Sequence, residues 1–405
     1  MTDRPALRRC AAVEPDRFAT EIWAARPLLS RAADLPSGFD DLFSLAAVDE
    51  LLSRRGLRTP FLRIAKNGVV LDRSRFTGPA GAGAEIDDQV IPDRVLDLFA
   101  SGHTIVLQAL HRNWPPIIEF TGQLAADLGH PVQVNAFVTP PQNTGFSTHY
   151  DVHDVFVLQV AGEKRWVVHE PPLPRPLRDQ PWTDHRAAVD AAATGEPVLA
   201  EVLRPGDSLY LPRGYLHAAE ALGEVSAHLT VGVHPVTRYA VVQALTALAA
   251  DVPELRASLP LGVDGTDPGQ LGPDLTATVE ALVGWLRRAD PAAVADRLHG
   301  RLASAAPPAP VAPVAQAAAA TSAGAGTVIQ LRRGLRCRLR TDGDRVLLDL
   351  PDRRLSLPPS TEPAVKAVLS GNPLAVADLP GLEPDDQLTL ARRLLREAIA
   401  VPVPP

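Results

Sequence analysis

Thr148-His149-Tyr150-Asp151-Val152-His153-Asp154-Val155-Phe156-Val157-Leu158-Gln159-Val160 is the stretch on which the fold prediction rests. It is rich in β-branched and aromatic residues, which predicts a β-strand. Side chains alternate between the two faces of a strand, so we expect His149 and Asp151 on one face. An imidazole and a carboxylate in this arrangement form two corners of a metal site, and the prediction then depends on a third ligand.

Short segments of similar composition recur on both sides of this stretch. Turn signals such as Asn67-Gly68 and Gly162-Glu163 separate them, which is typical of hairpins. The pattern predicts an antiparallel barrel or jelly roll of the cupin type between residues 60 and 235. The other predicted strands are 60–65, 68–71, 104–110, 132–139, 164–169, 201–203, 206–212 and 226–233, and the predicted helices are 92–99, 116–128 and 184–193.

The character of the chain changes after about residue 238. Apolar residues at helical spacing predict helices at 239–251, 276–288 and 291–302, which are candidates for a bundle or a dimer interface. Residues 303–327 are mostly Ala, Pro, Ser and Gly, which predicts a linker. In the last segment, 328–405, strands at 337–340 and 345–350 flank a turn at Gly343, and helices follow at 362–370 and 385–399. The expected class is α+β, with domains at 1–237, 238–302 and 328–405.

The composition limits which partners and which cellular compartment we expect for the protein. The chain has 405 residues with a net charge of −7, so no global positive field favours nucleic acid. Only two cysteines, Cys10 and Cys337, are present, which excludes a disulfide framework and favours a reducing compartment. No run reaches the roughly 20 apolar residues of a membrane span, and the N-terminus lacks the apolar core of a signal peptide. We therefore expect a cytoplasmic protein.

His217 is the candidate for the third metal ligand. It ends the segment Gly206-Asp207-Ser208-Leu209-Tyr210-Leu211-Pro212-Arg213-Gly214-Tyr215-Leu216-His217, in which a strand enters a Pro-Gly turn. Its separation from His149 and Asp151 along the sequence is long enough for a barrel to close and bring the three residues together. Two histidines and one carboxylate form the facial triad of non-haem Fe(II) oxygenases, which leaves coordination positions open. No catalytic group beyond these metal ligands is required.

Lys164 is the candidate for binding an anion. It lies fifteen residues after His149, at the start of the next predicted strand. A lysine directed into a barrel needs an anion as its partner, and a dicarboxylate cosubstrate supplies one.

Other polar residues on the predicted strands are candidates for lining the pocket. His153 continues the face of His149 and Asp151, as an alternative ligand, a substrate contact or a rim residue. Asn135 and Ser226 are candidates for cofactor binding, and Gln108 and Tyr150 for substrate contact, with satisfied core hydrogen bonding as the competing interpretation. His228 should share the face of Ser226. The remaining histidines have no partners at ligand spacing, and we interpret them as structural: His103, His111, His130, His169, His185, His234 and His299.

Other catalytic signatures are missing from the sequence. It contains no Gly-x-Ser-x-Gly elbow, CxxC pair, HExxH helix or dinucleotide fingerprint. The glycine-rich run at 78–84 lacks the Lys-Ser/Thr of a phosphate loop, which favours a surface loop.

Taken together, these motifs resemble the JmjC-type ribosomal oxygenases, which include a bacterial ribosomal-protein arginine hydroxylase and animal nucleolar histidine hydroxylases. The matching motifs span 135–217, and the resemblance in layout extends over nearly the whole chain. It implies a JmjC barrel, a helical dimerisation region and a C-terminal winged helix. The residues that carry it are Asn135, Thr139-Pro140-Pro141, Gly145-Phe146, His149-Tyr150-Asp151, Phe156-Val157-Leu158-Gln159, Gly162-Glu163-Lys164-Arg165-Trp166 and the segment 206–217.

The resemblance implies Fe(II) held by His149, Asp151 and His217, with Lys164 pairing with the distal carboxylate of 2-oxoglutarate. The expected reaction is O₂-dependent hydroxylation of a protein side chain, with Arg or His of a ribosomal protein as the candidate target and a homodimer as the expected assembly. One alternative is a hydroxylase of a peptide or small biosynthetic intermediate.

Another alternative is a non-catalytic metal-binding cupin that contacts a partner or DNA. The arginine cluster in the last domain keeps DNA contact open, although solvated strand edges explain the cluster more simply and nucleic acid is not the expected partner. The cluster comprises Arg332, Arg333, Arg336, Arg338 and Arg340.

Overall fold

The computed structural model describes residues 3–66, 68–83, 85–141, 143, 147–305 and 307–403. The chain divides into two compact units, Met1–Pro235 and Val236–Pro405. Several residues used in the predicted turn, glycine-rich loop, motif and linker lie outside the described residues: Asn67, Ala84, Gly145, Phe146 and Ala306.

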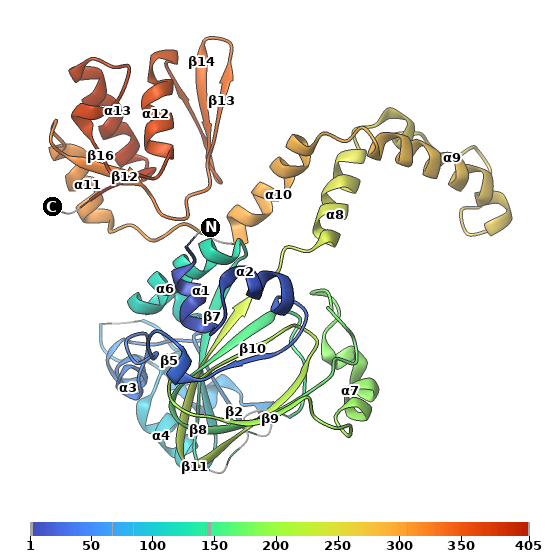
Figure 1. Ribbon diagram of the computed structural model, residues 1–405, viewed down its shortest axis with the longest axis vertical. Coiled ribbons are helices and arrows are strands. Elements are labelled where there is room, and N and C mark those ends of the chain that lie inside the picture. Colours follow the sequence, from blue (N-terminus) through green and yellow to red (C-terminus); the bar gives the residue numbers. More distant parts are fainter. Residues whose placement is uncertain are drawn as a thin grey trace. The chain divides into compact units, whose positions relative to one another are not determined.

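The first unit is built around a nine-stranded antiparallel sheet (Figure 1). Its order is β1-β10-β8-β11-β7-β6-β2-β3, and β9 pairs with β8 beside this path. The strands are β1 Leu28–Ser30, β2 Leu62–Lys66, β3 Val69–Val70, β6 Thr104–Leu107, β7 Val132–Thr139, β8 Asp154–His169, β9 Leu199–Leu203, β10 Ser208–Leu211 and β11 Leu216–Val233, with a separate pair β4 Thr77–Gly78 and β5 Gln89–Val90.

The two longest strands, β8 and β11, pair with each other antiparallel along most of their length. The predicted turn at Gly162-Glu163 is wrong, because β8 continues through it as one strand. Gly162 has φ +59°, and a Cβ there would lie 2.2 Å from the carbonyl oxygen of Val225 on β11. The register of β11 shifts between Leu222 and Ala227, opposite this glycine. The first half of β8 therefore pairs with β10, and its second half pairs with β9.

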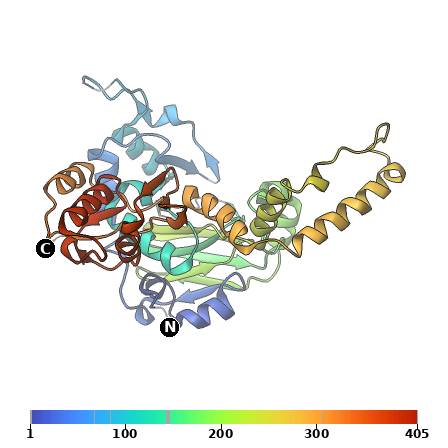
Figure 2. The ribbon, with the colours of Figure 1, turned by 90° about the horizontal axis from the view of Figure 1, so that it is seen from above.

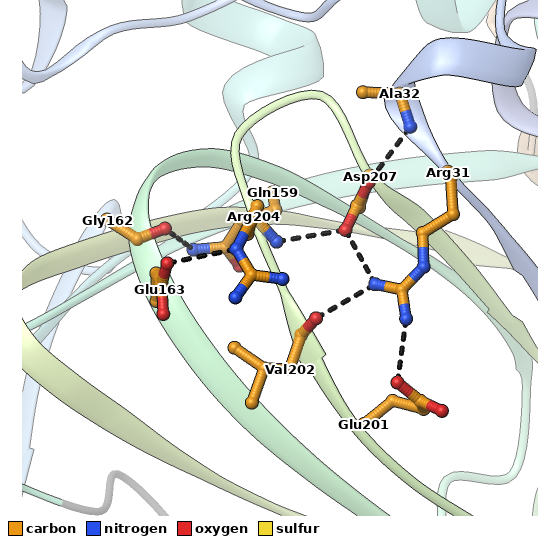
Figure 3. A network of polar contacts seen from close by, with 9 residues as sticks. All are labelled: Arg31, Ala32, Gln159, Gly162, Glu163, Glu201, Val202, Arg204 and Asp207. Atoms are coloured by element: carbon orange, nitrogen blue, oxygen red, sulfur yellow. Dashed lines mark hydrogen bonds and ion pairs between the residues drawn. The ribbon is translucent and has the colours of Figure 1, made fainter.

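A polar network joins the turn before β10 to the N-terminal segment (Figure 3). Asp207 is buried and accepts hydrogen bonds from the Arg31 guanidinium at 3.0 Å and the Ala32 amide at 2.9 Å. Its carboxylate also accepts from the Arg204 amide at 3.0 Å. Because all three donors converge on one carboxylate, Asp207 connects the residues that follow β1 to the turn between β9 and β10.

Residues on β7 alternate between the helix-covered face and the opposite face, as a period of two requires. Val134, Ala136 and Val138 belong to the large core that β7 shares with the helices, whereas Asn135 and Phe137 line a cavity. The helices of this unit are α1 Pro5–Cys10, α2 Pro15–Arg17, α3 Leu45–Arg54, α4 Pro92–Ala100, α5 Leu110–Asn113, α6 Pro115–Leu128 and α7 Arg186–Ala192. The helices predicted at 92–99, 116–128 and 184–193 are confirmed as α4, α6 and α7.

The second unit begins with the helices α8 Arg238–Ala249, α9 Pro268–Leu286 and α10 Pro291–Ala305. In α9 no described residue is buried, and the helix runs back along the loop that precedes it (Figure 2). Helices at the three predicted positions are therefore confirmed.

The C-terminal part of this unit has its own core. The segment 303–327, predicted as a linker, contains a helix, α11, whose Gln316 and Ala320 are buried. Gln316 Nε2 donates to the carbonyl oxygens of Leu395 at 2.8 Å and Ala400 at 2.7 Å, so the prediction is wrong for this segment. The elements are α11 Pro313–Ser322, α12 Glu362–Leu369, α13 Pro384–Arg396, β12 Val328–Leu331, β13 Arg338–Asp342, β14 Arg345–Asp349, β15 Arg354–Leu357, β16 Leu374–Ala375 and β17 Ala400–Pro402.

Of the helices in the described part of the chain, none is both long enough and apolar enough to traverse a lipid bilayer.

Candidate metal centre

Three predicted ligands converge in the first unit. One ligand atom from each of His149, Asp151 and His217 lies within 4.8 Å of the other two. His217 Nε2 is 3.7 Å from Asp151 Oδ2, and the rings of His149 and His217 have centroids 4.5 Å apart. Among the described residues, this is the one group of three such side chains close enough to hold a metal ion.

The backbone that positions these ligands is not the predicted strand. The strand β8 begins at Asp154, and residues 148–153 are irregular apart from an isolated bridge between His149 and His217. The His149 amide donates to the His217 carbonyl at 3.2 Å, and the His217 amide donates to the His149 carbonyl at 2.9 Å. The Gly214 amide donates to the carbonyl of Asp151 at 3.0 Å. Two segments far apart in the sequence thus hold each other in place.

A buried carboxylate strengthens this connection. Asp154 is fully buried, and its Oδ1 accepts a hydrogen bond from the Arg213 amide at 2.8 Å. Its Oδ2 also forms an ion pair with the Arg213 guanidinium at 3.6 Å. Because Asp154 begins β8 and Arg213 precedes the turn at Gly214, this pair fixes the entry of both ligand-bearing segments.

Backbone carbonyls determine which nitrogen each histidine presents. His149 Nδ1 lies 2.8 Å from the Ser147 carbonyl, and His217 Nδ1 lies 3.2 Å from the Tyr215 carbonyl. A carbonyl only accepts, so Nδ1 carries the proton in both rings and Nε2 is the ligand nitrogen.

The protonation states also suit metal binding. Burial, together with the neighbouring His149, lowers the pKa of His217 to about 4, so its imidazole is neutral at physiological pH. Partial burial opposes the ionisation of Asp151, but the surrounding His153, His217 and His149 outweigh it and lower the pKa of that carboxyl. A neutral imidazole and an ionised carboxylate are the forms that ligate a metal.

The three residues open into a cavity of about 770 Å³. Polar side chains from several strands converge on it, which is typical of ligand sites. Its lining comprises Arg63, Gly68, Val69, Gln108, Ala109, His111, Gln133, Asn135, Phe137, Thr139, Ser147, His149, Asp151, His153, Val155, Val157, Lys164, Trp166, Trp182, Arg186, His217, Ala218, Ala219, His228 and Thr230.

Lys164 lies in this cavity and is only 3% exposed. Its Nζ is 3.1 Å from Thr139 Oγ1 and 3.1 Å from His228 Nδ1. Among the described residues, no ion pair includes Lys164, and burial lowers its pKa to about 7. A buried lysine without a carboxylate partner either loses its proton or pairs with an anion from outside the chain.

The structure divides the weaker candidates into two groups. Asn135, Gln108 and His153 line the cavity. Tyr150 does not, because it is buried beside Val189 and Leu216 and its hydroxyl donates to the Gln180 carbonyl at 2.9 Å.

Ser226 also lies outside the cavity lining. It is fully buried, and its Oγ accepts a hydrogen bond from Gln159 Nε2 at 2.9 Å. The predicted cofactor contact of Ser226 and substrate contact of Tyr150 therefore give way to core hydrogen bonds, which was the competing interpretation.

Residues to which the sequence assigned no role in the site also contribute. Thr139 and His228 contact Lys164, and Trp166 packs edge-on to His228 with ring centroids 5.4 Å apart. Trp166 was part of the motif, and its alternation with Lys164 along β8 is the one signal that could have placed it near the site. His228 had no such signal, because its contact with Lys164 spans 64 residues.

Known proteins resemble this chain in sequence and fold. Residues 118–241 match the JmjC domain family. Ribosomal oxygenase 1 of Bos taurus is 31% identical over 237 residues, which cover 56% of this chain and 34% of that protein. The bifunctional lysine-specific demethylase and histidyl-hydroxylase NO66 of Aedes aegypti is 29% identical over 218 residues, covering 54% of this chain and 32% of that protein. The chain thus matches about a third of the length of these curated relatives.

The fold likeness extends further than the sequence likeness. The structure of the ribosomal oxygenase YcfD from Escherichia coli in complex with cobalt and 2-oxoglutarate superimposes with a TM-score of 0.54. The match covers 98% of this chain and 99% of that one at 17% identity, so it concerns the fold. Residues 118–241 thus match the JmjC domain family, and the chain is similar to ribosomal oxygenases in sequence over about half of its length and in fold over nearly all of it, in agreement with the resemblance inferred from the motifs.

Proposed function

We propose that this chain is an Fe(II)- and 2-oxoglutarate-dependent oxygenase that hydroxylates a protein side chain. The observation that carries the proposal is the joint presence, in one cavity, of a two-histidine, one-carboxylate group and a buried lysine that has no carboxylate partner among the residues that the structure describes. The first fits a metal with open positions, and the second fits a dicarboxylate.

The donor set supports iron as the resident metal. His149, Asp151 and His217 would hold it through two imidazole nitrogens and a carboxylate oxygen, and the Nδ1 contacts of both histidines already orient their rings. When bound, iron with 2-oxoglutarate supplies the oxidising power for C–H hydroxylation by O₂, with release of succinate and CO₂. The side chains around it provide position and charge, because the hard chemistry belongs to the cofactor.

Lys164 would pair with the distal carboxylate of 2-oxoglutarate. Its ammonium, on β8, is held by contacts with Thr139 on β7 and His228 on β11, so its position is fixed before a ligand binds. Fixing one end of the cosubstrate in this way restricts its orientation before reaction.

Two lines of support favour a protein side chain as the substrate. The proteins that the chain resembles are ribosomal oxygenases and a lysine-specific demethylase and histidyl-hydroxylase. The cavity wall also offers Gln133 and His153, whose nitrogens lie 3.3 Å apart, as hydrogen-bonding groups for a polar side chain. An arginine or histidine of a ribosomal protein is therefore the proposed target.

The first experiment measures succinate formed from 2-oxoglutarate with Fe(II). We expect turnover by the wild type and loss of both turnover and iron binding in His149→Ala and Asp151→Ala. His103→Ala is the matched control, since His103 lies outside the cavity lining. Equal turnover by all variants, or a wild type that binds no iron, would refute the metal site.

The second experiment identifies the substrate. Intact-mass spectrometry of ribosomal proteins from a deletion strain should show one protein lighter by one oxygen atom, with restoration by the purified enzyme. A full set of unchanged ribosomal proteins would instead favour a peptide or small-molecule substrate. Iron binding without any 2-oxoglutarate turnover would favour the non-catalytic cupin.

The proposed organisation retains a catalytic domain at 1–237, a dimerisation region at 238–302 and a winged-helix-like domain at 328–405. Support for the dimer comes from α9, where Leu275, Val279, Val283 and Leu286 are exposed apolar residues. Light scattering should give twice the mass of the chain, and Val279→Asp with Val283→Asp should halve that mass. A wild type of single mass would contradict the dimer.

A further inference from the structure

The surroundings of Lys164 account for two of its three ammonium hydrogens. Nζ lies 3.1 Å from Thr139 Oγ1 on one side and 3.1 Å from His228 Nδ1 on the other. Both are neutral acceptors, and an ammonium group carries three donors. One donor is therefore left for an anion in the cavity.

His228 is held in one orientation by aromatic rings. Its ring stacks on Phe137 with centroids 5.1 Å apart and planes 4° apart, and Trp166 packs edge-on from another side. Burial and the adjacent Lys164 keep the pKa of His228 well below its ordinary value, so the ring is neutral. Because Nδ1 accepts from Lys164, the single ring proton is at Nε2, which makes Nε2–H a donor.

Thr139 offers a further donor. Its Oγ1 accepts from Lys164 and also lies 3.3 Å from Thr104 Oγ1, which donates to it. With both acceptor positions used, the Thr139 hydroxyl hydrogen is left for another group. Thr139 and His228 both line the cavity that contains Lys164.

We propose that His228 is a positioning residue that holds Lys164 toward the cavity. With Lys164 and Thr139 it forms a subsite of three hydrogen-bond donors for a carboxylate. Binding of that carboxylate is accompanied by the uptake of a proton on Lys164. This inference rests on the proposed function, since it concerns the distal carboxylate of 2-oxoglutarate. It goes further in assigning a role to His228 and in predicting that binding is linked to pH.

The direction of the linkage follows from burial. Lys164 has its pKa lowered to about 7, so near neutral pH a large share of the anion-free protein has an uncharged amine there. A carboxylate against Nζ favours the ammonium form and returns the pKa toward its ordinary value of about 10.4. The titratable group that contacts Lys164 from β11 is His228, the contact from β7 is the hydroxyl of Thr139, and its partner positions Leu203 on β9 and Ala221 on β11 are uncharged.

The chain is well suited to a direct measurement, because it contains three lysines, Lys66, Lys164 and Lys366. With ¹³C,¹⁵N-lysine, NMR of the Zn(II)-loaded full chain should show one lysine side chain, that of Lys164, titrating near pH 7. Addition of 2-oxoglutarate should move this titration upward by two pH units or more. The assignment comes from loss of one signal in Lys164→Met.

Binding measurements separate the role of His228 from general packing. His228→Phe keeps a ring beside Phe137 but removes the hydrogen-bond acceptor and the hydrogen-bond donor of the imidazole. His228→Asn retains a hydrogen-bond acceptor and a hydrogen-bond donor. By calorimetry, His228→Phe should weaken 2-oxoglutarate binding about tenfold or more, the range for a lost hydrogen bond to a charged group. Binding of 2-oxopentanoate, which lacks the distal carboxylate, should be unchanged, and His228→Asn should recover part of the loss.

The possible outcomes separate this inference from the proposed function. If wild type binds 2-oxoglutarate but Lys164 titrates above pH 10 with and without it, proton uptake is refuted. If His228→Phe binds both ligands as the wild type does, the positioning role is refuted and the oxygenase proposal stands. If metal-loaded wild type fails to bind 2-oxoglutarate at all, the proposed function fails and this inference fails with it.

Discussion

Replacing Lys164 by methionine should stabilise the ligand-free protein. The side chain is 3% exposed, and burial lowers its pKa from 10.5 to about 7. In the unfolded chain the same amine is protonated up to pH 10.5, so unfolding at neutral pH takes up a proton. By linkage, this proton uptake costs the folded state about 4 kcal/mol at pH 7 and about 1 kcal/mol at pH 9.5.

The sign of the pH dependence follows from the same comparison. Between about pH 7 and 10.5 the unfolded chain binds the proton and the folded chain does not, so wild-type stability rises with pH in this window. Methionine fills a similar volume without a charge, so Lys164→Met lacks this contribution. The stability difference between variant and wild type should therefore shrink by about 3 kcal/mol from pH 7 to pH 9.5.

Urea unfolding of the metal-free protein at both pH values measures this difference. Tryptophan fluorescence is a suitable signal for the first unit, because Trp23, Trp114, Trp166 and Trp182 lie there and only Trp285 lies in the second. Other titrating groups cancel because variant and wild type are compared at the same pH. The exposed Lys366→Met, which makes the same substitution at the surface, is the control.

A stability difference that is the same at both pH values would refute the reasoning. It would mean that Lys164 keeps an ordinary pKa in the folded protein. A destabilised Lys164→Met would show that the contacts with Thr139 and His228 outweigh the cost of burying the amine.

Three further substitutions test the fold. Gly162→Ala should destabilise the first unit by more than Gly223→Ala in thermal unfolding; both glycines have positive φ, but only a Cβ at 162 meets the Val225 carbonyl, so equal losses would contradict the close approach. Asp207→Ala should cost about 3 kcal/mol in urea unfolding, since it leaves buried donors unsatisfied, and a loss below about 1 kcal/mol would remove its structural role. Gln316→Ala should cost about 2 kcal/mol and increase amide exchange near 395–400 while leaving 2-oxoglutarate binding unchanged; unaltered exchange would contradict the packing of α11.

Much of the candidate site follows from local sequence. The chemical types at 149, 151 and 217 define the ligand set without any coordinates, because few chemistries use two histidines and a carboxylate at this spacing. Alternation along β7 likewise separates the core residues Val134 and Ala136 from the cavity residue Asn135. These features depend on residue type and on the period of a strand, both of which can be read from the sequence.

Other features depend on contacts between distant segments. The irregular stretch 148–153 has the composition of a strand, yet bonds to residues 214–217 give it a different course. The sequence around Gly162 predicts a turn, but β8 continues through this glycine and pairs with β11, whose register shifts opposite it. Local propensity is weak compared with such tertiary contacts, and so these predictions failed.

By itself, the sequence determined that two histidines, an aspartate and a lysine were available for metal and anion binding, because side-chain chemistry is independent of the fold. Only the tertiary structure decided which other groups surround them. It placed His228 and Thr139 against Lys164 across 64 and 25 residues of chain, and it moved Ser226 and Tyr150 into hydrogen bonds away from the cavity. The physical reason is that burial, hydrogen-bond satisfaction and pKa depend on neighbours in space, and the pairing of β11 with β7 and β8 brings those neighbours together.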